Sequence, residues 1–318
     1  EDQPARPRLV SIEADLVDMG KYECSSVAQQ VVDKHMSVIQ ALENEVIIDA
    51  YSDIHLLPLD VNISSIRTRY QQTTVGALFC QLIKEELEDR CDVCMINGAT
   101  IKGDKTYPDG KISYAQLKSE LPFPTKMVVV PMKPHEVYDA ILYSRTAYED
   151  GADPDADEIP RRGFLQVDYD MDKRWEQLAY SNEEKMLRVA LPRNLLNGFC
   201  KIKPLIDVGN RLKEQNLFPG KDDYVPAIDL IVRHACKSRF YQLVGDKPFN
   251  YFDLNDDGVL DRYEIKVMMT EVLGYEPADF VVDDMLASVD LNGKGVIDQG
   301  EFSFLLAQME REHSQFGK

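Results

Sequence analysis

Apolar and polar residues follow different periods along the chain, and each period predicts a kind of element. They alternate over residues 9–16, which predicts a strand. Over residues 25–46 the apolar positions recur at helical spacing and Ser25 can cap the start, which predicts a helix. A single strand followed by a helix leaves the strand's backbone groups without a partner. The isolated strand suggests that something upstream of it is missing from the sequence.

Short strands and helices alternate in the middle of the chain, from residue 56 to about residue 188. Thr73 or Thr74 can cap one helix and Ser113 the next, because a hydroxyl placed before a helix accepts a hydrogen bond from its first turn. From Asp207 onward the pattern becomes helical. The expected strands are 56–66, 92–96, 126–132, 164–169 and 186–191, and the expected helices are 74–87, 114–119, 134–143 and 227–241.

Residues 253–264 place oxygen-bearing side chains at alternate positions around a glycine. Calcium takes about six to eight oxygen ligands, and one short loop supplies them only if alternate side chains point inward. Gly258 permits the sharp turn, and Glu264 can close the shell with both oxygens. An acidic surface turn is the alternative, but the joint match of all positions favours an EF-hand, a helix–loop–helix calcium site. The expected ligands are Asp253, Asn255, Asp257, Val259 through its carbonyl, Asp261 and Glu264.

A second loop of the same kind begins at Asp290 and differs at one ligand position. Lys294 stands at the fifth position, where an oxygen is needed, and an ammonium group has no acceptor. The ligand positions of loop one carry a charge of −4, whereas three acids and Lys294 give loop two −2. We therefore predict that loop one binds calcium, and that loop two binds weakly or supports loop one through pairing of residues 259–260 with 296–297. The expected ligands of loop two are Asp290, Asn292, Val296, Asp298 and Glu301.

Composition narrows the classes of partner. The 318 residues carry a formal net charge of −19, which argues against nucleic acid and anionic membrane surfaces, since both attract basic patches. No apolar run reaches the roughly 18 residues that a membrane-spanning helix needs. Six cysteines are too few for a disulfide framework, and the apolar run around Cys91 and Cys94 favours buried thiols over a redox or zinc site. The sparse cysteines favour an intracellular location only slightly, so the compartment stays unassigned.

Five motifs in the middle of the chain occur in a specific order, at residues 60–83, 94–102, 109–114, 120–123 and 163–167. Together, over residues 59 to about 205, they resemble the C-terminal, substrate-binding domain of the 5'-nucleotidase family. The resemblance implies a 5'-nucleotidase C-terminal-like α/β domain at 51–225. Residues 1–50 would then be the tail of a two-metal phosphoesterase domain, and 226–318 an all-α EF-hand pair. The expected fold class is α+β.

The resemblance also implies which residues hold the substrate, namely Asn97, Lys102 and Phe123. Lys102 stands where the family has an arginine, and lysine lacks the bidentate guanidinium fork. Asn194 stands where the family has a second base-stacking aromatic residue, and Cys200 where it has an aspartate. Losing one ring forfeits roughly 1–3 kcal/mol of stacking. Ordinary nucleotide recognition is therefore expected to be impaired or redirected.

Two functions remain open at this stage. The first is a calcium-binding C-terminal segment of a 5'-nucleotidase-like metallophosphoesterase, a hydrolase. This segment is non-catalytic by itself, because the metal-ligand motifs of the two-metal domain do not occur in the sequence. The alternative is a degenerate nucleotidase-derived scaffold that acts as a calcium-responsive structural or interaction component of a larger assembly. The candidate partners are Ca²⁺, a nucleotide or phosphorylated small molecule, and a protein bound through the EF-hand pair. Met268, Met269, Met285 and Met309 are suitably placed to line a groove for that protein, although methionines on helices are more often part of a plain core.

Overall fold

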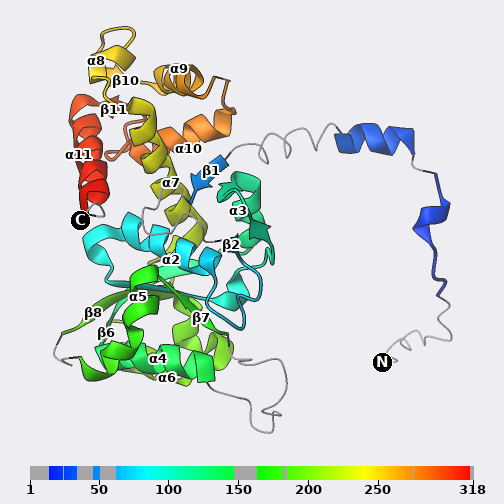
Figure 1. Cartoon of the computed structure of the whole chain (residues 1–318), viewed down its shortest axis with the longest axis vertical. Coiled ribbons are helices and arrows are strands. Elements are labelled where there is room, and N and C mark those ends of the chain that lie inside the picture. Colours follow the sequence, from blue (N-terminus) through cyan, green and yellow to red (C-terminus); the bar gives the residue numbers. More distant parts are fainter. Residues whose placement is uncertain are drawn as a thin grey trace, which may run out of the picture. The chain divides into compact units, whose positions relative to one another are not determined.

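The computed structural model describes residues 14–23, 25–33, 46–50, 62–146, 163–181, 185–274 and 276–315 (Figure 1). The chain divides into two compact units, Glu1–Gln40 and Ala41–Lys318. In the first unit, η1 (Met19–Lys21) is a 3-10 turn and residues 26–33 are helical, which confirms the start of the helix expected over 25–46. Residues 34–45 lie outside the described part, and Val46 opens a strand instead of ending that helix. Of the strand expected over 9–16, only residues 14–16 are described, and they have no regular structure.

The second unit is built on a mixed five-stranded sheet in the order β7-β3-β8-β6-β9. Only β3 and β8 run parallel, and the other neighbouring pairs are antiparallel. Side chains of β3 alternate between two cores, so that Val93 and Met95 pack on one face and Cys94 and Ile96 on the other. The bounds are β7 Leu165–Val167, β3 Val93–Asn97, β8 Leu187–Pro192, β6 Lys126–Met132 and β9 Val225–Pro226.

Helices cover both faces of this sheet (Figure 1). α2 (Thr74–Leu87) and α7 (Ala227–Val244) lie on one face, and α4 (Pro134–Thr146) and α6 (Lys203–Glu214) lie on the other. The predicted alternation of strands and helices is confirmed, with ends shifted by a few residues. The segment expected as a strand over 164–169 is shorter, because α5 (Tyr169–Arg174) begins within it.

Two predicted helix caps are present. Thr73 accepts a hydrogen bond from the Gly76 amide at the start of α2. Ser113 accepts from the Gln116 amide, and the Gln116 side chain accepts from the Ser113 amide, which completes a capping box on α3 (Tyr114–Glu120). Ser113 is also the last residue of β5 (Lys111–Ser113), which pairs antiparallel with β1 (Val46–Asp49). A further pair joins β2 (Ile63–Ser64) to β4 (Thr106–Tyr107); residues 51–61 of the strand expected over 56–66 lie outside the described part.

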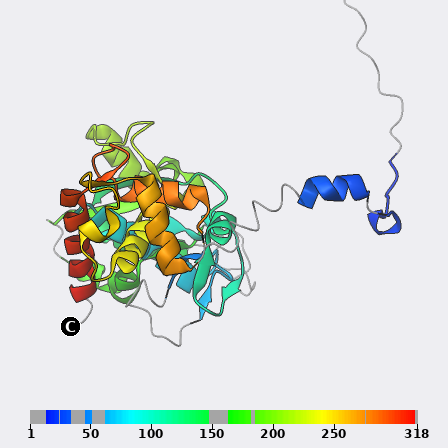
Figure 2. The ribbon, with the colours of Figure 1, turned by 90° about the horizontal axis from the view of Figure 1, so that it is seen from above.

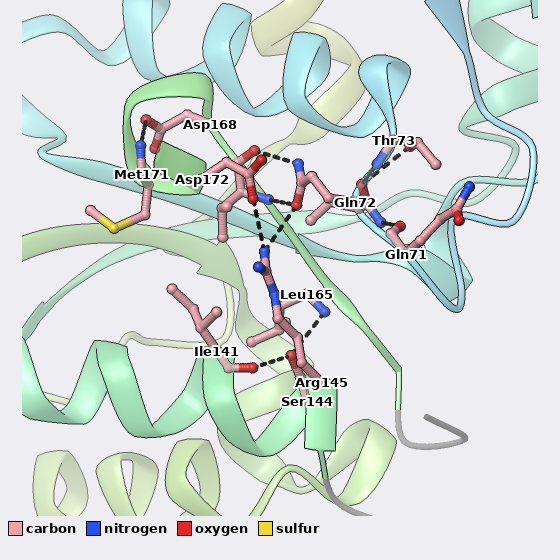
Figure 3. Close-up of polar contacts among 12 residues, drawn as sticks. Gln71, Gln72, Thr73, Ile141, Ser144, Arg145, Leu165, Asp168, Met171 and Asp172 are labelled. Atoms are coloured by element: carbon pink, nitrogen blue, oxygen red, sulfur yellow. Dashed lines mark hydrogen bonds and ion pairs between the residues drawn. The ribbon is translucent and has the colours of Figure 1, made fainter. Parts of the chain in front are cut away.

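A polar network fixes the edge strand β7 to its neighbours (Figure 3). Gln72 donates from its side-chain amide to the Val167 carbonyl at 2.9 Å and accepts from the Val167 amide at 3.2 Å. Arg145 of α4 donates to Asp172 of α5 at 3.1 Å and to Gln72 at 3.3 Å. Its guanidinium also lies 5.0 Å from the centroid of the Trp175 ring. These contacts hold the loop before α2, the sheet edge and α4 in one arrangement.

The helix α7 belongs to two hydrophobic cores at once. Leu230 and Ile231 in its first half pack on the core that contains α2, whereas Phe240 and Leu243 in its second half pack among the C-terminal helices. Figures 1 and 2 show α11 (Gln299–Gln315), coloured red, alongside α7, coloured yellow. The other C-terminal helices are α8 Phe249–Phe252, α9 Arg262–Leu273 and α10 Asp279–Val289. None of the helices in the described ranges is long and apolar enough to cross a membrane.

The helix that enters loop one, α8, contains only four residues, among them Phe249 and Phe252. The chain leaves α7 at Gly245, which has a φ of +53°, a value that L-residues rarely adopt. Pro248 then precedes α8. Both phenylalanines are nonetheless buried, as the apolar pattern predicts.

Candidate functional site

Loop one runs from α8 to α9 and folds its polar side chains back over its own backbone. Asp253 accepts a hydrogen bond from the Gly258 amide at 2.9 Å. Asn255 accepts from the Asp257 amide at 2.9 Å, and Asp257 accepts from the Val259 amide at 3.0 Å. Gly258 has a φ of +83°, so the sixth position needs the conformational freedom of glycine. The turn expected from the sequence is therefore present.

Glu264, the twelfth residue of loop one, is 2 % exposed and holds the two ends of the loop together. One carboxylate oxygen accepts from the Leu254 amide at 2.8 Å, and the other accepts from the Asp261 amide at 2.9 Å. Asp261 accepts in return from the Glu264 amide at 2.9 Å, which makes the pair the capping box of α9. Because an ionised carboxylate has about four acceptor sites, each Glu264 oxygen keeps capacity for a cation.

The chemical type of the side-chain donors in loop one suits calcium, but the donors do not surround a common position for an ion. Its side-chain donors are carboxylate and amide oxygens, the ligands that a hard cation prefers. Within the ranges that the structure describes, no three or more His, Cys, Asp or Glu side chains are gathered closely enough to hold a metal ion. Calcium binding at loop one would require the predicted ligands to lie closer together than they do here.

Loop two shares two of its backbone contacts with loop one. Asp290 accepts from the Gly295 amide at 2.6 Å, as Asp253 does from its own sixth-position glycine. Glu301 accepts from the ninth-position amide of Asp298 at 3.1 Å, as Glu264 does from Asp261. Its other oxygen accepts from the third-position amide of Asn292 at 2.9 Å, whereas Glu264 accepts from the second-position amide of Leu254.

Lys294 distinguishes the two loops. Its ammonium nitrogen lies 3.9 Å from a carboxylate oxygen of Asp298, which is one of the predicted calcium ligands. The Lys294 side chain is 65 % exposed, so this ion pair is weak by itself. It still places a positive charge at the position where loop two would need an oxygen. Val296, the predicted carbonyl ligand, is partly buried immediately before β11.

The two loops are joined by the short antiparallel pair β10 (Val259–Leu260) and β11 (Ile297–Asp298). Leu260 faces Ile297 in the register, and both side chains are fully buried. The pairing expected between the loops is confirmed. The second strand is one residue later than predicted, so that Asp298, and not Val296, belongs to it.

The four methionines that could line a groove or form a plain core lie inside the C-terminal core. Met268, Met269, Met285 and Met309 are all at most 4 % exposed. Met269 and Met285 border a cavity of about 20 Å³, which is too small for a helix. The structure therefore shows a closed helix pair, and an open groove stays a prediction for another state.

The second candidate site is a cavity of about 430 Å³ on the α/β part of the unit. Lys102 and Phe123, two of the residues predicted to hold a substrate, line it together. The Lys102 ammonium nitrogen lies 5.9 Å from the centroid of the Phe123 ring, and that ring is 59 % exposed. Asn97, the third predicted residue, is 1 % exposed and accepts a hydrogen bond from Thr100, which does line the cavity. Asn97 therefore supports the wall of the cavity.

A second phenylalanine, Phe199, also lines the cavity and is 51 % exposed. Its neighbours adopt left-handed backbone conformations, with a φ of +96° at Gly198 and +62° at Cys200. A non-glycine residue with such a φ is uncommon and costs energy unless its surroundings hold it. Asn194, at the position expected to lack a ring, lines the same cavity. Phe199 therefore places a second exposed ring in the cavity, five residues after Asn194.

Four basic residues give the cavity a positive character: Arg69, Lys102, Lys126 and Arg193. The pKa of Lys102 is lowered, first by burial and then by the nearby charge of Arg69. Two like charges close together are relieved by an anion between them. The cavity therefore combines exposed aromatic rings with cations, an arrangement suited to an aromatic anion.

The family profile described as 5'-nucleotidase, C-terminal domain, matches residues 54–189. Residues 54–189 form a 5'-nucleotidase C-terminal domain. Lys102 and Phe123 fall within this domain, whereas Asn194 and Phe199 lie beyond the matched residues. The 5'-nucleotidase precursor from Thermus thermophilus is a structural neighbour with a TM-score of 0.41 and 16 % identity, covering 64 % of this chain and 40 % of that one.

The C-terminal helices have relatives of a different kind. "Probable calcium-binding protein CML13" of Oryza sativa subsp. japonica is 36 % identical over 58 residues, which are 18 % of this chain and 34 % of that protein. A calmodulin-like protein of the same organism is 33 % identical over 67 residues, 21 % of this chain and 39 % of its own length. The chain thus spans between 34 % and 39 % of the length of these curated relatives. The 5'-nucleotidase C-terminal domain is followed by an EF-hand pair.

Phe199 and the cations Arg69, Lys126 and Arg193 were not identified as cavity residues from the sequence. No period or motif marks a single exposed phenylalanine in a 3-10 turn. Arg69 lies in a turn after β2, and no neighbouring motif in the sequence indicates a site there. Phe199 and Arg69 reach the cavity only because the domain brings the segments around 69, 102, 123 and 199 together.

Proposed function

We propose that the chain is the calcium-binding and ligand-binding segment of a 5'-nucleotidase-like phosphoesterase. Calcium binding is supported by two contacts that both loops make. The first residue of each loop accepts a hydrogen bond from the sixth-position amide, and the twelfth residue accepts one from an amide near the start of the loop. The names of the rice relatives, a calcium-binding and a calmodulin-like protein, support it. No observation favours the scaffold alternative over this proposal.

Loop one is the tighter of the two sites in this proposal. Its ligand positions carry a charge of −4, and loop two carries −2 because Lys294 replaces an oxygen. Charge count and rigidity tune EF-hand dissociation constants over several orders of magnitude. Loop two then acts mainly through β11, which completes the two-stranded pair that holds loop one in shape.

Calorimetric titration of the full chain with calcium, using two matched variants, tests this assignment. Glu264→Gln removes the twelfth-position carboxylate of loop one, and Glu301→Gln removes its counterpart in loop two. Both keep a side chain of the same shape, although the glutamine oxygen can accept from only one of the two loop amides that each glutamate bonds. The tight binding event should disappear in Glu264→Gln and persist in Glu301→Gln. Absence of heat with the unmodified chain, or loss of the tight event only in Glu301→Gln, would contradict the proposal.

We also propose that the cavity holds a nucleotide or a related phosphorylated small molecule. The exposed rings of Phe123 and Phe199 offer stacking surfaces for a base, worth roughly 1–3 kcal/mol each. Lys102 and Arg69 supply the charge for a phosphate, and lysine does so as a point charge. The C-terminal domain family to which residues 54–189 belong supports a nucleotide as the first compound to test.

Titration of the full chain with adenosine 5'-monophosphate, adenosine and ribose 5-phosphate separates the two contributions. The monophosphate should bind more tightly than either fragment, because only it engages both the rings and the cations. Lys102→Arg should tighten monophosphate binding by restoring a bidentate contact, and Lys102→Ala should weaken it. Equal binding of adenosine and its monophosphate would contradict the role given to the cations.

A further inference from the structure

One short helix, α3, contacts both the EF-hand pair and the ligand cavity. Its first residue, Tyr114, packs against Phe280 of α10 with ring centroids 5.3 Å apart and ring planes inclined by 49°. Its last residue, Glu120, is fully buried and bonded to the loop that carries Lys102. Tilted rings at this separation attract each other beyond the effect of the area they bury. α3 therefore links the C-terminal helices to the cavity.

On the calcium side, α10 is tied to α9, the helix that leaves loop one. Arg262 of α9 pairs with Asp279 of α10 at 3.2 Å, and Lys266 of α9 pairs with the same carboxylate at 3.0 Å. These exposed ion pairs are weak singly, but α9 and α10 also share one hydrophobic core. A rearrangement of α9 at loop one is therefore transmitted to α10, and with it to Phe280.

A second contact leads from the EF-hand core to the start of α3. Val46 and Ile47 of β1 border the same small cavity as Met269 and Met285. In the β1–β5 pair, Val46 lies opposite Ser113, the residue that caps α3. The first turn of α3 is thus held from two directions by residues that rest on the calcium-binding module.

On the cavity side, the end of α3 sets the position of Lys102. The Glu120 carbonyl accepts from the Lys102 amide at 2.9 Å, and its carboxylate accepts from the Gly103 amide at 2.8 Å. Tyr107 donates to the same carboxylate at 2.7 Å. The approach is so close that a Cβ at Gly103 would overlap the Glu120 carboxylate. Phe123 follows three residues after α3, so both cavity residues move with the end of this helix.

We propose that calcium bound at loop one changes the affinity of the cavity for its ligand by repositioning α3. This coupling rests on the proposed function. In EF-hand sensors calcium changes the angle between the helices that flank the loops by tens of degrees, which is enough to displace a ring contact such as Phe280 on Tyr114. Couplings between sites are usually about 5–150-fold in affinity, and the ligand must change calcium affinity by the same factor.

The test has two parts. The full chain is titrated with adenosine 5'-monophosphate in saturating calcium and in chelator. It is also titrated with calcium in the presence and absence of the monophosphate. The unmodified chain should show at least about a fivefold difference in monophosphate affinity between the two conditions, and the same factor in calcium affinity. Tyr114→Ala and Phe280→Ala should bind both ligands, but their affinity for the monophosphate should be the same in calcium and in chelator. Tyr114→Phe, which keeps the ring, should behave like the unmodified chain. Phe304→Ala removes a ring that is 51 % exposed on α11 and should change nothing.

The outcomes separate the coupling from the function it rests on. If calcium and the monophosphate both bind but neither alters the other, the coupling is wrong and the proposed function stands. If coupling persists in both Tyr114→Ala and Phe280→Ala, α3 does not carry it, and the proposal is overturned. If calcium does not bind, the proposed function fails and the coupling fails with it. Glu264→Gln should bind the monophosphate equally in calcium and in chelator.

Discussion

The buried ion pair between α7 and α2 gives the most quantitative prediction. The Lys237 ammonium nitrogen lies 3.1 Å and 2.9 Å from the two carboxylate oxygens of Glu86. The two side chains are only 10 % and 7 % exposed. Burial raises the pKa of Glu86, and Lys237 partly offsets that rise. Replacing Lys237 by methionine keeps the volume of the side chain but leaves a buried carboxylate without its partner, which usually costs about 3–5 kcal/mol.

The size of this loss depends on pH in a way that can be worked out. Without Lys237, the folded protein can relieve the buried charge by protonating Glu86. From an ordinary pKa of 4.5, protonation costs about 3 kcal/mol at pH 7 and about 0.7 kcal/mol at pH 5, at 1.36 kcal/mol per pH unit. A carboxyl whose pKa is raised on folding makes the folded state bind more protons, so stability rises as pH falls toward 4.5. Lys237→Met should therefore recover most of its lost stability between pH 7 and pH 5.

Urea unfolding followed by circular dichroism at pH 7 and pH 5 measures the effect. The control is the double variant Glu86→Gln with Lys237→Met, which removes both charges and should be closer to the unmodified chain at pH 7 than the single variant is. A single variant that is equally destabilised at both pH values would refute the buried-charge explanation. So would a double variant that is as unstable at pH 7 as the single one.

Three further predictions concern the cavity, the thiols and a surface ion pair. Phe199→Ala should weaken adenosine 5'-monophosphate binding by about 5–150-fold, the equivalent of 1–3 kcal/mol, while Phe304→Ala should not; equal affinities would remove Phe199 from the site. Burial raises the pKa of Cys91 to about 12, so iodoacetamide at pH 8 should modify it in urea but not in the folded protein, as mass spectrometry can show. Hydrogen bonds from Arg188 lower the pKa of Asp92 to about 2, and the stability this supplies is present above the unfolded pKa of about 3.9 and is lost as pH falls toward 2. The melting temperature of Asp92→Asn should accordingly be lower than that of the unmodified chain at pH 7 and approach it below pH 4; a constant difference would contradict this.

The sequence predicted most of the elements because their signals are local. The apolar, valine-rich run at 126–132 became β6 with the same bounds, and Ser113 caps α3 as expected from its position before the helix. The thiols of Cys91 and Cys94 are buried and free, as the apolar run around them indicated. Each of these features is determined by side chains within a few residues, so that period and capping chemistry were sufficient.

The features that were missed depend on distant contacts or on backbone strain. Phe199 reaches the cavity through left-handed residues on both sides, and no side-chain pattern marks such a conformation at Cys200. The single-turn α8 follows the break after α7 at Gly245, a backbone feature whose bounds were not predicted from the sequence. The role of α3 as a link depends on the contact between Tyr114 and Phe280, two residues that are far apart in the sequence. Spacing arguments identified the two paired loops, but the burial of the surrounding methionines became apparent only from the packed structure.

The most direct test of the central claim follows the sixth-position glycines by NMR during a calcium titration of ¹⁵N-glycine-labelled protein. The Gly258 amide donates to Asp253 at 2.9 Å, and the Gly295 amide donates to Asp290 at 2.6 Å, so each resonance reports the carboxylate of its own loop. Gly258 should shift at a lower calcium concentration than Gly295. If neither resonance moves, or if both move together, loop one is not the preferred calcium site.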